Sequence, residues 1–384
     1  MAKEGLTAYW NEDKKAGIRR RVAVVSLSSF CNEAVDMICQ QVRGATPLTH
    51  AFGRNEIGIN KKRLESSLLK TPLNPNVMSV LVVGYEPKST EEYVRQFKSL
   101  SRKRIESVVL LENGTLETIR AGASKAVDMV QQASELRREP ADYSDLIFGL
   151  KCGGSDTTSG VASNPAVGAA TDIIISRGGT AIFSETTEII GAEHILAKRA
   201  VSKEVGERIY EVAKRNEELA MSEGIDLIGT NPVPDNIKGG ISTIEEKSLG
   251  AILKSGSSKI QGVLEYEEQP KGRGLYFMDS PSAAQAVLTA LSAAGCQLIL
   301  FSTGTGNPVG NPISPVLKIT ANPVTAKKLH EHIDVDISAI LENKMTIQQA
   351  GKIVLEEAEK VVNGKLTKAE ILRHDEYAPL PAGL

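Results

Sequence analysis

The sequence predicts an α/β protein in which mainly parallel sheets carry helices on both faces and are divided between two domains. Short β-branched apolar runs alternate with longer stretches of helical spacing along the first half of the chain, and this order is typical of parallel sheets. A second set of strand-like and helical segments begins near residue 150. The length of 384 residues also exceeds the usual size of one domain, so each of two domains can bury its own core.

The first half contains four apolar runs of strand length, each bounded by turn residues. These runs are residues 21–27, 78–85, 106–112 and 143–150. Between these runs, apolar residues recur at the three- and four-residue spacing of a helix, in the segments NEAVDMICQQVRG, EEYVRQFKSLSRK and GTLETIRAGASKAVDMVQQASELRRE. The first half is therefore expected to form a sheet with helices packed on it.

The second half shows the same kinds of element. Residues 178–185 and 297–303 are strand-like, the stretch 191–224 is helical, and the tail is expected to form a helix and a short extended end. A charge run and Pro140 interrupt the structured stretches within 133–142, which is typical of a domain boundary. We therefore expect an N-terminal α/β domain of residues 1–140 and a C-terminal α/β domain of residues 141–384 that carries most active-site loops.

Composition excludes several function classes. The chain has 45 Lys and Arg against 47 Asp and Glu, a net charge of −2, so no global field attracts nucleic acid or an anionic membrane. No apolar stretch approaches the roughly 18 residues that span a bilayer, and the polar N-terminus does not resemble a signal peptide. Four cysteines without C-x-x-C spacing argue against a disulfide scaffold or a zinc ribbon. A cytoplasmic location is expected.

Polar, glycine-rich loops follow several of the predicted strands. They comprise residues 49–55, 151–160, 184–194 and 302–312, and a fifth polar segment occupies 229–250. In open parallel sheets, ligands bind outside the carboxyl ends of the strands. We therefore expect these loops to converge on one cleft.

The segment KCGGSDTTSGVASNPAVG at residues 151–168 has the densest mixture of glycine and polar residues. Gly153 and Gly154 permit positive φ, so that backbone N–H groups can approach an anion. Asp156 could act as an acid, a base or a metal ligand, and Cys152 could be a soft ligand. Alternatively, Asp156 caps the next helix and Cys152 is a small buried hydrophobe. Neither a Walker motif nor a G-x-G-x-x-G follows a strand, so a dinucleotide cofactor is not expected.

The loop SETTEIIGAEH brings together several metal-ligating residue types. Glu185, Glu188, Glu193 and His194 lie within ten residues, and such donors suit Fe²⁺, Mn²⁺ or Mg²⁺. The alternative is a strand-to-helix connection in which Glu193 favours the first helical turn. Histidine is rare in this chain, and the other loop histidine, His50, is close to Arg54. In segment 229–250, Lys238, Glu245 and Lys247 offer further charges, although STIEEK also matches a capping box.

Taken together, KCGGSD…SNPAVG, GAEHIL, TNPVPDNIKGGISTIEEKSLG, AAGCQLILFSTGTGNPVG and LKITAN resemble the altronate/galactarate dehydratase family. The resemblance covers roughly residues 20 to 325 in the right order. It implies a metal-dependent lyase, typically using ferrous iron, that acts on a hydroxy acid anion. Family members complete their active site with a small domain, which is fused at the N-terminus or is a separate subunit. Since no such domain precedes the matching region, a separate small subunit and a hetero-oligomer are implied.

The N-terminal half departs from the sugar-acid dehydratases of the family. Those members carry a cysteine at the position of Arg54 and another after the position of Gly84, where this chain reads HAFGRNEIG and VVGYEPK. The first of these segments looks more like that of the sulfolactate-cleaving members, which eliminate sulfite from (2R)-3-sulfolactate and give pyruvate. A guanidinium makes forked hydrogen bonds to oxyanions, so Arg54 is the candidate for binding the sulfonate.

The resemblance and the loop chemistry together give a set of expected roles. The expected metal ligands are His50, Cys152, Glu193 and His194. Proton transfer and its support are expected from Asp156, Glu188, Glu245 and Lys247. Substrate binding is expected from Arg54, Lys151, Gly153, Gly154, Ser155, Asn164, Thr303 and Asn307. The alternatives are a sugar-acid dehydratase that releases water and gives a 2-keto-3-deoxy acid, and a non-catalytic subunit that binds an anionic metabolite.

Overall fold

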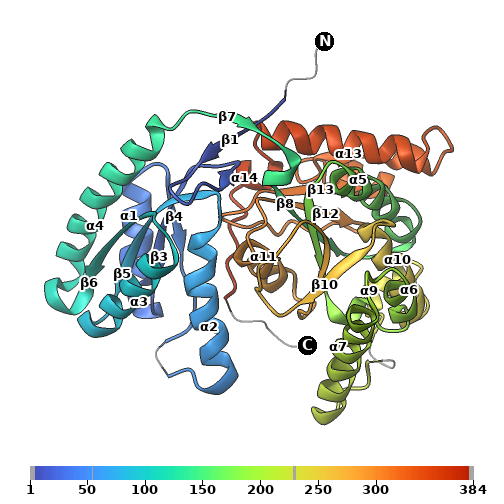
Figure 1. The fold of residues 1–384 in the computed structure, drawn as a ribbon, viewed down its shortest axis with the longest axis horizontal. Helices are drawn as coiled ribbons and strands as arrows, with labels where there is room; N and C mark the ends of the chain where they lie inside the picture. Colours follow the sequence, from blue (N-terminus) through green and yellow to red (C-terminus); the bar gives the residue numbers. More distant parts are fainter. Residues whose placement is uncertain (1–4, 54, 228–230, 380–384) are drawn as a thin grey trace.

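The computed structural model describes residues 5–53, 55–227 and 231–379. It contains two parallel sheets with helices on both faces, which confirms the predicted fold class (Figure 1). A small antiparallel sheet of three strands, which the sequence did not predict, joins β1 (Leu6–Trp10) to β2 (Ala16–Gly17) and β7 (Glu139–Ala141). No helix within the described ranges is long and apolar enough to cross a membrane.

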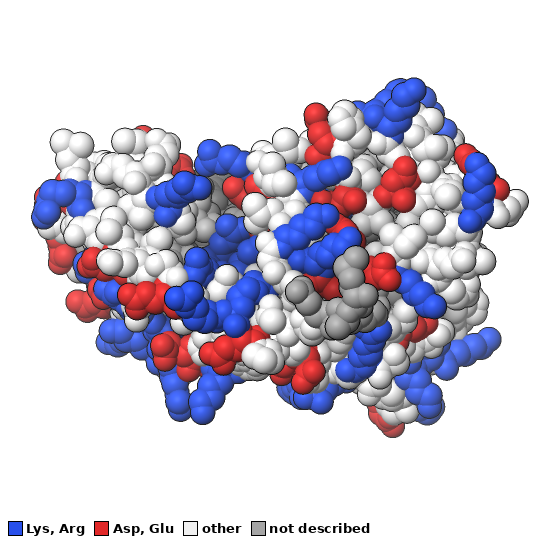
Figure 2. Space-filling view, turned by 90° about the horizontal axis from the view of Figure 1, so that it is seen from above, with Lys and Arg blue, Asp and Glu red and all other residues white. Residues whose placement is uncertain are grey.

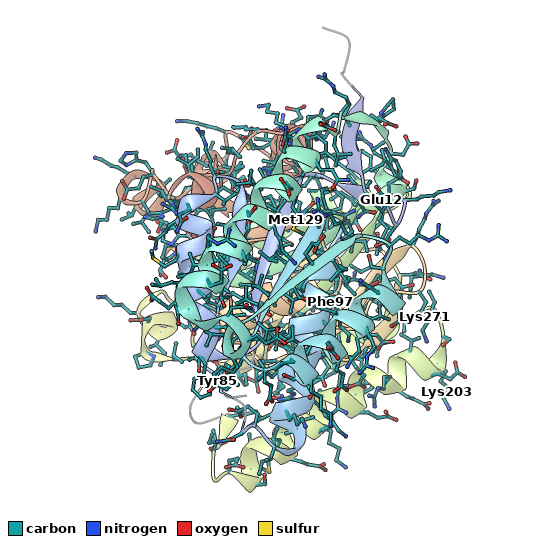
Figure 3. All side chains as sticks on the ribbon, turned by 90° about the vertical axis from the view of Figure 1, so that its left-hand side faces the viewer. Glu12, Tyr85, Phe97, Met129, Lys203 and Lys271 are labelled. Atoms are coloured by element: carbon teal, nitrogen blue, oxygen red, sulfur yellow. The ribbon has the colours of Figure 1, made fainter. Side chains whose placement is uncertain are left out.

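The N-terminal sheet has four parallel strands. In spatial order they are β4 (Ala45–Leu48), β3 (Arg21–Ser26), β5 (Val77–Gly84) and β6 (Arg104–Val109). The helices α1 (Asn32–Gln41) and α4 (Leu110–Glu135) cover one face, and α2 (Gly58–Lys70) and α3 (Pro87–Leu100) cover the other. Figure 3 shows Met129 of α4 and Phe97 of α3, which belong to the two separate apolar clusters of this sheet.

The C-terminal sheet has seven parallel strands. In spatial order they are β10 (Ile260–Leu264), β11 (Gly274–Met278), β9 (Thr180–Ser184), β8 (Ile147–Gly153), β12 (Leu298–Thr303), β13 (Val316–Thr320) and β14 (Val335–Asp336). The central strands are almost wholly buried, as expected for a parallel sheet covered on both faces.

Helices again occupy both faces of this sheet. One face carries α5 (Asn164–Ser176), α6 (Glu193–Lys198), α7 (Lys203–Ser222) and α13 (Ile347–Val362). The other face carries α11 (Ala284–Ala293), which also contacts α2. Shorter helices are α9 (Pro234–Lys238), α10 (Ile244–Ala251), α12 (Pro323–Lys328) and α14 (Lys368–Ile371). Because α9 and α10 lie in segment 229–250, that segment is more helical than the sequence predicted.

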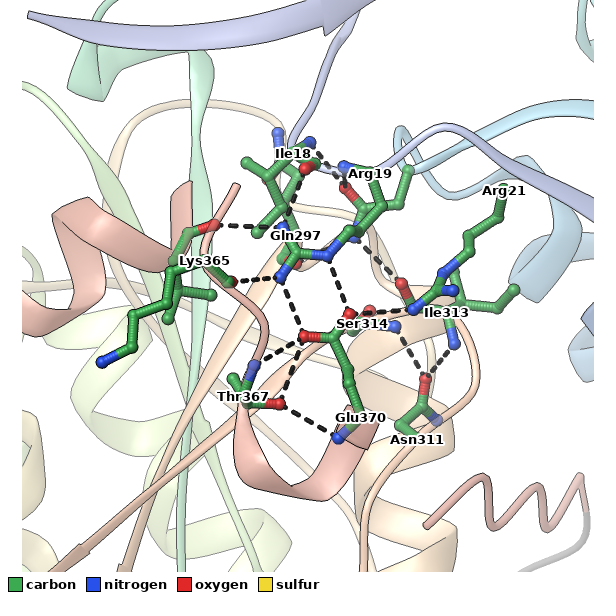
Figure 4. Close-up of polar contacts among 12 residues, drawn as sticks. Ile18, Arg19, Arg21, Gln297, Asn311, Ile313, Ser314, Lys365, Thr367 and Glu370 are labelled. Atoms are coloured by element: carbon green, nitrogen blue, oxygen red, sulfur yellow. Dashed lines mark hydrogen bonds and ion pairs between the residues drawn. The ribbon is translucent and has the colours of Figure 1, made fainter. Parts of the chain in front are cut away.

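Buried polar side chains tie the two halves together. Arg19 donates to both carboxylate oxygens of Glu370 at 2.8 Å, and Arg21 contacts the same carboxylate at 2.8 Å (Figure 4). The Asn74 amide donates to two carbonyls at the end of α11, and the Asn76 amide donates to the carbonyls of Gln297 and Ile313. These hydrogen bonds fix how the two sheets face each other, and so position loops from both halves.

Candidate active site

Five side chains at the carboxyl ends of β8 and β9 form a buried charged cluster. Its members are Lys151, Cys152, Glu185, Glu188 and Lys254, all no more than 4% exposed. Lys151 and Cys152 lie near the end of β8, Glu185 directly follows β9, and Glu188 ends the short 3-10 turn Thr186–Glu188. Because β8 and β9 are parallel neighbours, their carboxyl ends lie at the same edge of the sheet.

Hydrogen bonds and ion pairs link the cluster as one pair and one trio, and Lys151 Nζ joins the two by donating to the Cys152 carbonyl at 2.5 Å. Lys151 Nζ lies 2.6 Å from Glu185 Oε2. Lys254 Nζ lies 2.9 Å from Glu188 Oε2 and 3.2 Å from Cys152 Sγ. The thiol of Cys152 donates to Glu188 Oε2 at 2.9 Å. Two ammonium groups therefore balance two carboxylates in a site shielded from water, as buried charges require.

The two glutamates differ in environment. Burial raises the pKa of Glu185, and the neighbouring charge of Glu188 raises it further. Burial also acts to raise the pKa of Glu188, but the charges of Lys254 and Lys151 outweigh it and hold that pKa below its ordinary value. Burial raises the pKa of the Cys152 thiol to about 12, with the charge of Glu188 adding to the rise. Carboxylates whose pKa values diverge in this way are common at catalytic sites.

Glu185 stands out in two further respects. Its backbone has φ 83 and ψ 89, a left-handed conformation that is unfavourable for a residue with a side chain. Its Oε1 atom is buried and has no hydrogen-bond partner within the described residues. Hydrogen bonds from Glu185 N to Ser280 Oγ and from Thr186 N to the Ser280 carbonyl hold this turn in place.

The cluster contains a donor set that fits a divalent metal ion. One ligand atom each from Cys152, Glu185 and Glu188 lies within 4.8 Å of the others. It is the single group of three such donors within the described ranges. A thiolate with two carboxylate oxygens suits a borderline ion such as Fe²⁺ better than a closed structural zinc site.

The predicted metal ligands are only partly brought together. Cys152 lies in the cluster, whereas His194 is exposed on α6 and Glu193 accepts a hydrogen bond from Gly191 N at 2.9 Å. The ring of His50 is buried in the N-terminal domain, where Nδ1 accepts from Phe52 N and Nε2 contacts the Ser26 carbonyl. Burial lowers the pKa of His50. Metal binding by His50, Glu193 and His194 stays a prediction.

Asp156 is held as a helix cap. Its Oδ1 accepts hydrogen bonds from Thr158 Oγ1 at 2.7 Å and from Ser159 N at 2.8 Å, and its Oδ2 accepts from Asn322 Nδ2 at 2.8 Å. These contacts occupy both carboxylate oxygens. The structure thus places Asp156 as the helix cap that the alternative interpretation describes, and its catalytic role stays a prediction.

A cavity of about 220 Å³ beside the cluster brings together four of the predicted residues, Ser155, Asp156, Asn164 and Lys247. Lys247 donates to Asn231 Oδ1 at 3.0 Å, and its charge acts on Glu188. The Asn164 amide nitrogen donates to the Gly250 carbonyl at 3.0 Å, whereas its buried oxygen has no partner in the described part of the chain. The residues that line this hollow include none of the five cluster members, so the two are related through the charge of Lys247 on Glu188.

The remaining predicted residues lie around these loops. Gly154 has φ +64, as predicted for close backbone approach, and its carbonyl accepts from Gly304 N and Thr305 N. Gly153 pairs with Thr303 across β8 and β12, and a Cβ at Gly153 would lie 3.5 Å from Asn307. Glu245 is exposed on α10. Arg54 lies outside the described residues, so its sulfonate-binding role stays a prediction.

Two members of the cluster, Glu185 and Lys254, were not among the expected site residues. Glu185 belongs to the acidic loop that was singled out, and its position directly after a buried strand was the available signal. Lys254 lies in a 3-10 turn about a hundred residues from Cys152 in sequence. The signal for Lys254 was a single lysine within the otherwise apolar and small-residue stretch GAILKSG.

Comparison with known proteins identifies the family. The family described as D-galactarate/altronate dehydratase, C-terminal, matches residues 143–383, and the one described as D-galactarate dehydratase/altronate hydrolase, second domain, matches residues 8–134. The chain belongs to the galactarate/altronate dehydratase family. The resemblance drawn from the motifs is thereby confirmed.

Relatives within this family are named for elimination reactions. The chain is 40% identical to the (2R)-sulfolactate sulfo-lyase subunit beta of Chromohalobacter salexigens over 96% of this chain and 95% of that protein. It is 30% identical to the altronate dehydratase of Bacillus subtilis, over 98% of this chain and 77% of that protein. It is 37% identical to the galactarate dehydratase of Escherichia coli, over 58% of this chain and 42% of that protein. By family, the chain is a lyase.

Solved structures add nothing to this assignment. A glycosyl transferase family 9 protein from Veillonella parvula aligns over 91% of this chain and 99% of that one, at 10% identity and a TM-score of 0.21. A likeness at that level carries no argument about fold or function.

Proposed function

We propose that this chain is the large catalytic subunit of a metal-dependent carbon–sulfur lyase that eliminates sulfite from (2R)-3-sulfolactate and yields pyruvate. The observation that supports this substrate is the 40% identity to a sulfolactate sulfo-lyase subunit along nearly the whole of both chains. That relative is named as one subunit of its enzyme. A separate small subunit is therefore proposed to complete the active site.

The elimination requires a proton acceptor at C2. When the C2–H bond breaks, its electron pair forms the C2–C3 double bond while the C3–S pair leaves with sulfite. The enolpyruvate that remains becomes pyruvate by moving its hydroxyl proton to C3. Glu185 is assigned as the acceptor of the C2 proton because its buried Oε1 has no partner in the described residues.

The other members of the cluster hold and balance charge. Cys152 and Glu188 would hold a divalent metal ion, with Glu185 beside them, and Fe²⁺ is proposed ahead of Mn²⁺ or Mg²⁺. When bound, such an ion would supply Lewis-acid stabilisation of the negative charge that develops as the C2 proton is removed. Lys151 and Lys254 keep the glutamates oriented and stabilise the negative charge that develops on the enolate.

The test measures products with the chain and its small subunit, under anaerobic conditions with added Fe²⁺. Sulfite and pyruvate in equal amounts from 3-sulfolactate are expected. Release of a 2-keto-3-deoxy acid from altronate or galactarate, without sulfite from sulfolactate, would instead assign a sugar-acid dehydratase. Absence of every product from the metal-loaded complex would leave the non-catalytic binding subunit as the function.

A variant pair tests the assignment of Glu185. Glu185→Gln keeps the shape of the side chain but removes the base, and kcat should fall by roughly 10²- to 10⁴-fold. Glu207→Gln, on the exposed surface of α7, serves as the matched control and should keep its kcat. Retention of turnover by Glu185→Gln would show that another group takes the C2 proton.

A further inference from the structure

A basic pocket lies at the edge of the C-terminal sheet opposite to the charged cluster. Its volume is about 340 Å³, and its walls include Trp10, Lys14, Lys15, Lys271 and Arg273. The pocket also contacts the first residue of β8, Ile147, and the first residue of β9, Thr180. Since Cys152 lies five residues further along β8, the pocket and the cluster are separated by about 17 Å of strand. The two sites are therefore distinct.

The cations of this pocket are not neutralised by the protein. Lys14, Lys15, Lys271 and Arg273 are all exposed, and within the described ranges none forms an ion pair with a carboxylate. In Figure 2, the face seen from above carries Lys and Arg side chains near its middle, with Asp and Glu side chains among them.

The acidic side chains nearby are already engaged. Asp13 accepts hydrogen bonds from Ser101 Oγ and Arg102 N, which point it towards β6. Asp145, which lines the pocket, accepts from Asp142 N at 2.8 Å. Glu268 accepts from Glu265 N at 2.9 Å. Four cations line the pocket against one carboxylate, that of Asp145, so the pocket keeps an excess of positive charge.

The walls of the pocket are held rigidly. The side chain of buried Asn11 accepts from Asp13 N and Lys15 N and donates to the Pro75 carbonyl, which fixes the turn that carries Lys14 and Lys15. At the base, Gln297 donates to the carbonyls of Ala16 and Asp145 and accepts from Ile147 N. These contacts reduce the ordering cost of binding a ligand between the cations.

We infer that the basic pocket binds a small polyanion carrying two or more phosphate- or carboxylate-type groups. Its volume lies within the range of small-molecule sites. The Lys and Arg side chains in its walls can each contact an oxyanion through charge-assisted hydrogen bonds. The half-buried ring of Trp10 adds an apolar surface for the body of the ligand.

Such a ligand would touch both family domains at once. Trp10, Lys14 and Lys15 lie in the segment 8–134, whereas Lys271 and Arg273 lie in the segment 143–383. A polyanion held between them would bridge the two domains. The inference does not depend on the substrate proposed for the charged cluster.

Trp10 makes the test direct because it is the only tryptophan of the chain. Its fluorescence is recorded at low ionic strength while tripolyphosphate, which does not absorb at the excitation wavelength, is added. Citrate is then titrated in the same way to separate phosphate from carboxylate chemistry. A saturable change with either probe, matched by heat in isothermal titration calorimetry, is expected. Its absence with both probes up to about 10 mM would overturn the inference.

A pair of double variants locates the site. Lys271→Ala with Arg273→Ala should weaken binding by roughly tenfold or more, because two charge-assisted contacts are lost. Lys327→Ala with Lys328→Ala removes the same charge from exposed positions on α12 and should leave the affinity unchanged. Equal affinity in the first variant and the unmodified chain would place the polyanion elsewhere and contradict the inference. Circular dichroism of both variants checks that they are folded.

Discussion

The ammonium nitrogen of Lys151 lies 2.6 Å from Glu185 Oε2, and both side chains are almost wholly buried. Lys151 also contacts the ring of Phe301, at 5.6 Å from its centroid. Because neither charge is hydrated, each of the two charged groups is stabilised in the buried site by the other. Removing one partner of a buried pair leaves an uncompensated charge, which is far more destabilising than the pair itself is stabilising.

We therefore expect Lys151→Met to reduce the free energy of unfolding by about 3–5 kcal/mol. The double variant Lys151→Met with Glu185→Gln should recover much of this loss, since the remaining amide is neutral. Urea unfolding measures both. Lys203→Met breaks an exposed pair with Glu207 and should change stability by no more than about 1 kcal/mol. Equal losses in the single and double variants would argue against dependence between the two charges.

Metal content should depend on Cys152 and Glu188. Cys152→Ser replaces a soft thiolate by a weakly binding hydroxyl, and we expect it to lower the Fe²⁺ bound per chain at least tenfold. Cys31→Ser removes another buried free cysteine in the N-terminal domain and is the matched control. Metal analysis after dialysis measures both. Full metal content in Cys152→Ser and in Glu188→Gln would show that the ion is held elsewhere.

Asp156 provides a test between capping and catalysis. Asp156→Asn keeps an oxygen that can accept hydrogen bonds from Thr158 Oγ1 and Ser159 N. Its new amide nitrogen, however, faces the amide nitrogen of Asn322, and two donors cannot bond to each other. We expect a stability loss of about 1 kcal/mol and a kcat within about tenfold of the unmodified enzyme. Asp156→Ala should lose about 0.5–2 kcal/mol. A loss of kcat of a thousandfold in the folded Asn variant would restore the catalytic role.

The meeting of the loops after β8 and β9 could be predicted from sequence because it follows from parallel neighbouring strands. Lys151 and Cys152 directly end one apolar run, and Glu188 follows another, so topology alone placed them together. Lys254 could not be found in this way, since it follows no strand and reaches the cluster from a turn after α10. The rarity of histidine singled out His50 and His194, and metal binding by both stays a prediction. His194 shares a loop with Glu188 but is exposed.

The contacts that join the two domains could not be predicted from the sequence either. The paired contacts of Arg19 and Arg21 with Glu370 join residues about 350 positions apart, and no local pattern records such a partner. The small antiparallel sheet was missed for a related reason. Its strands β2 and β7 contain only two and three residues, too short for alternation to be visible.

Stability should fall as pH rises through neutrality because of Glu267, a buried residue at the contact with α2. Ser67 Oγ contacts Glu267 Oε1 and also donates to the Pro379 carbonyl at 2.8 Å. One hydroxyl has a single proton, so the contact with Glu267 is best satisfied when the carboxyl is neutral. Burial raises the pKa of Glu267 to about 7, against smaller opposing effects from Ser67, Ser66, Lys70 and Arg63. The phenol groups of Tyr266 and Tyr377 also face it.

The sign of the effect follows from the raised pKa. The folded state keeps a proton that the unfolded state releases above its ordinary pKa of 4.5, so this stabilisation is complete below that pH and is lost as pH rises through about 7. The total loss is about 3 kcal/mol. Glu267→Gln mimics the neutral carboxyl and should be more stable than the unmodified chain at pH 8, but similar to it at pH 5. Urea unfolding across this range tests the expectation, with Glu268→Gln as control. Identical pH profiles for Glu267→Gln and the unmodified chain would show that Glu267 is ionised in the folded protein.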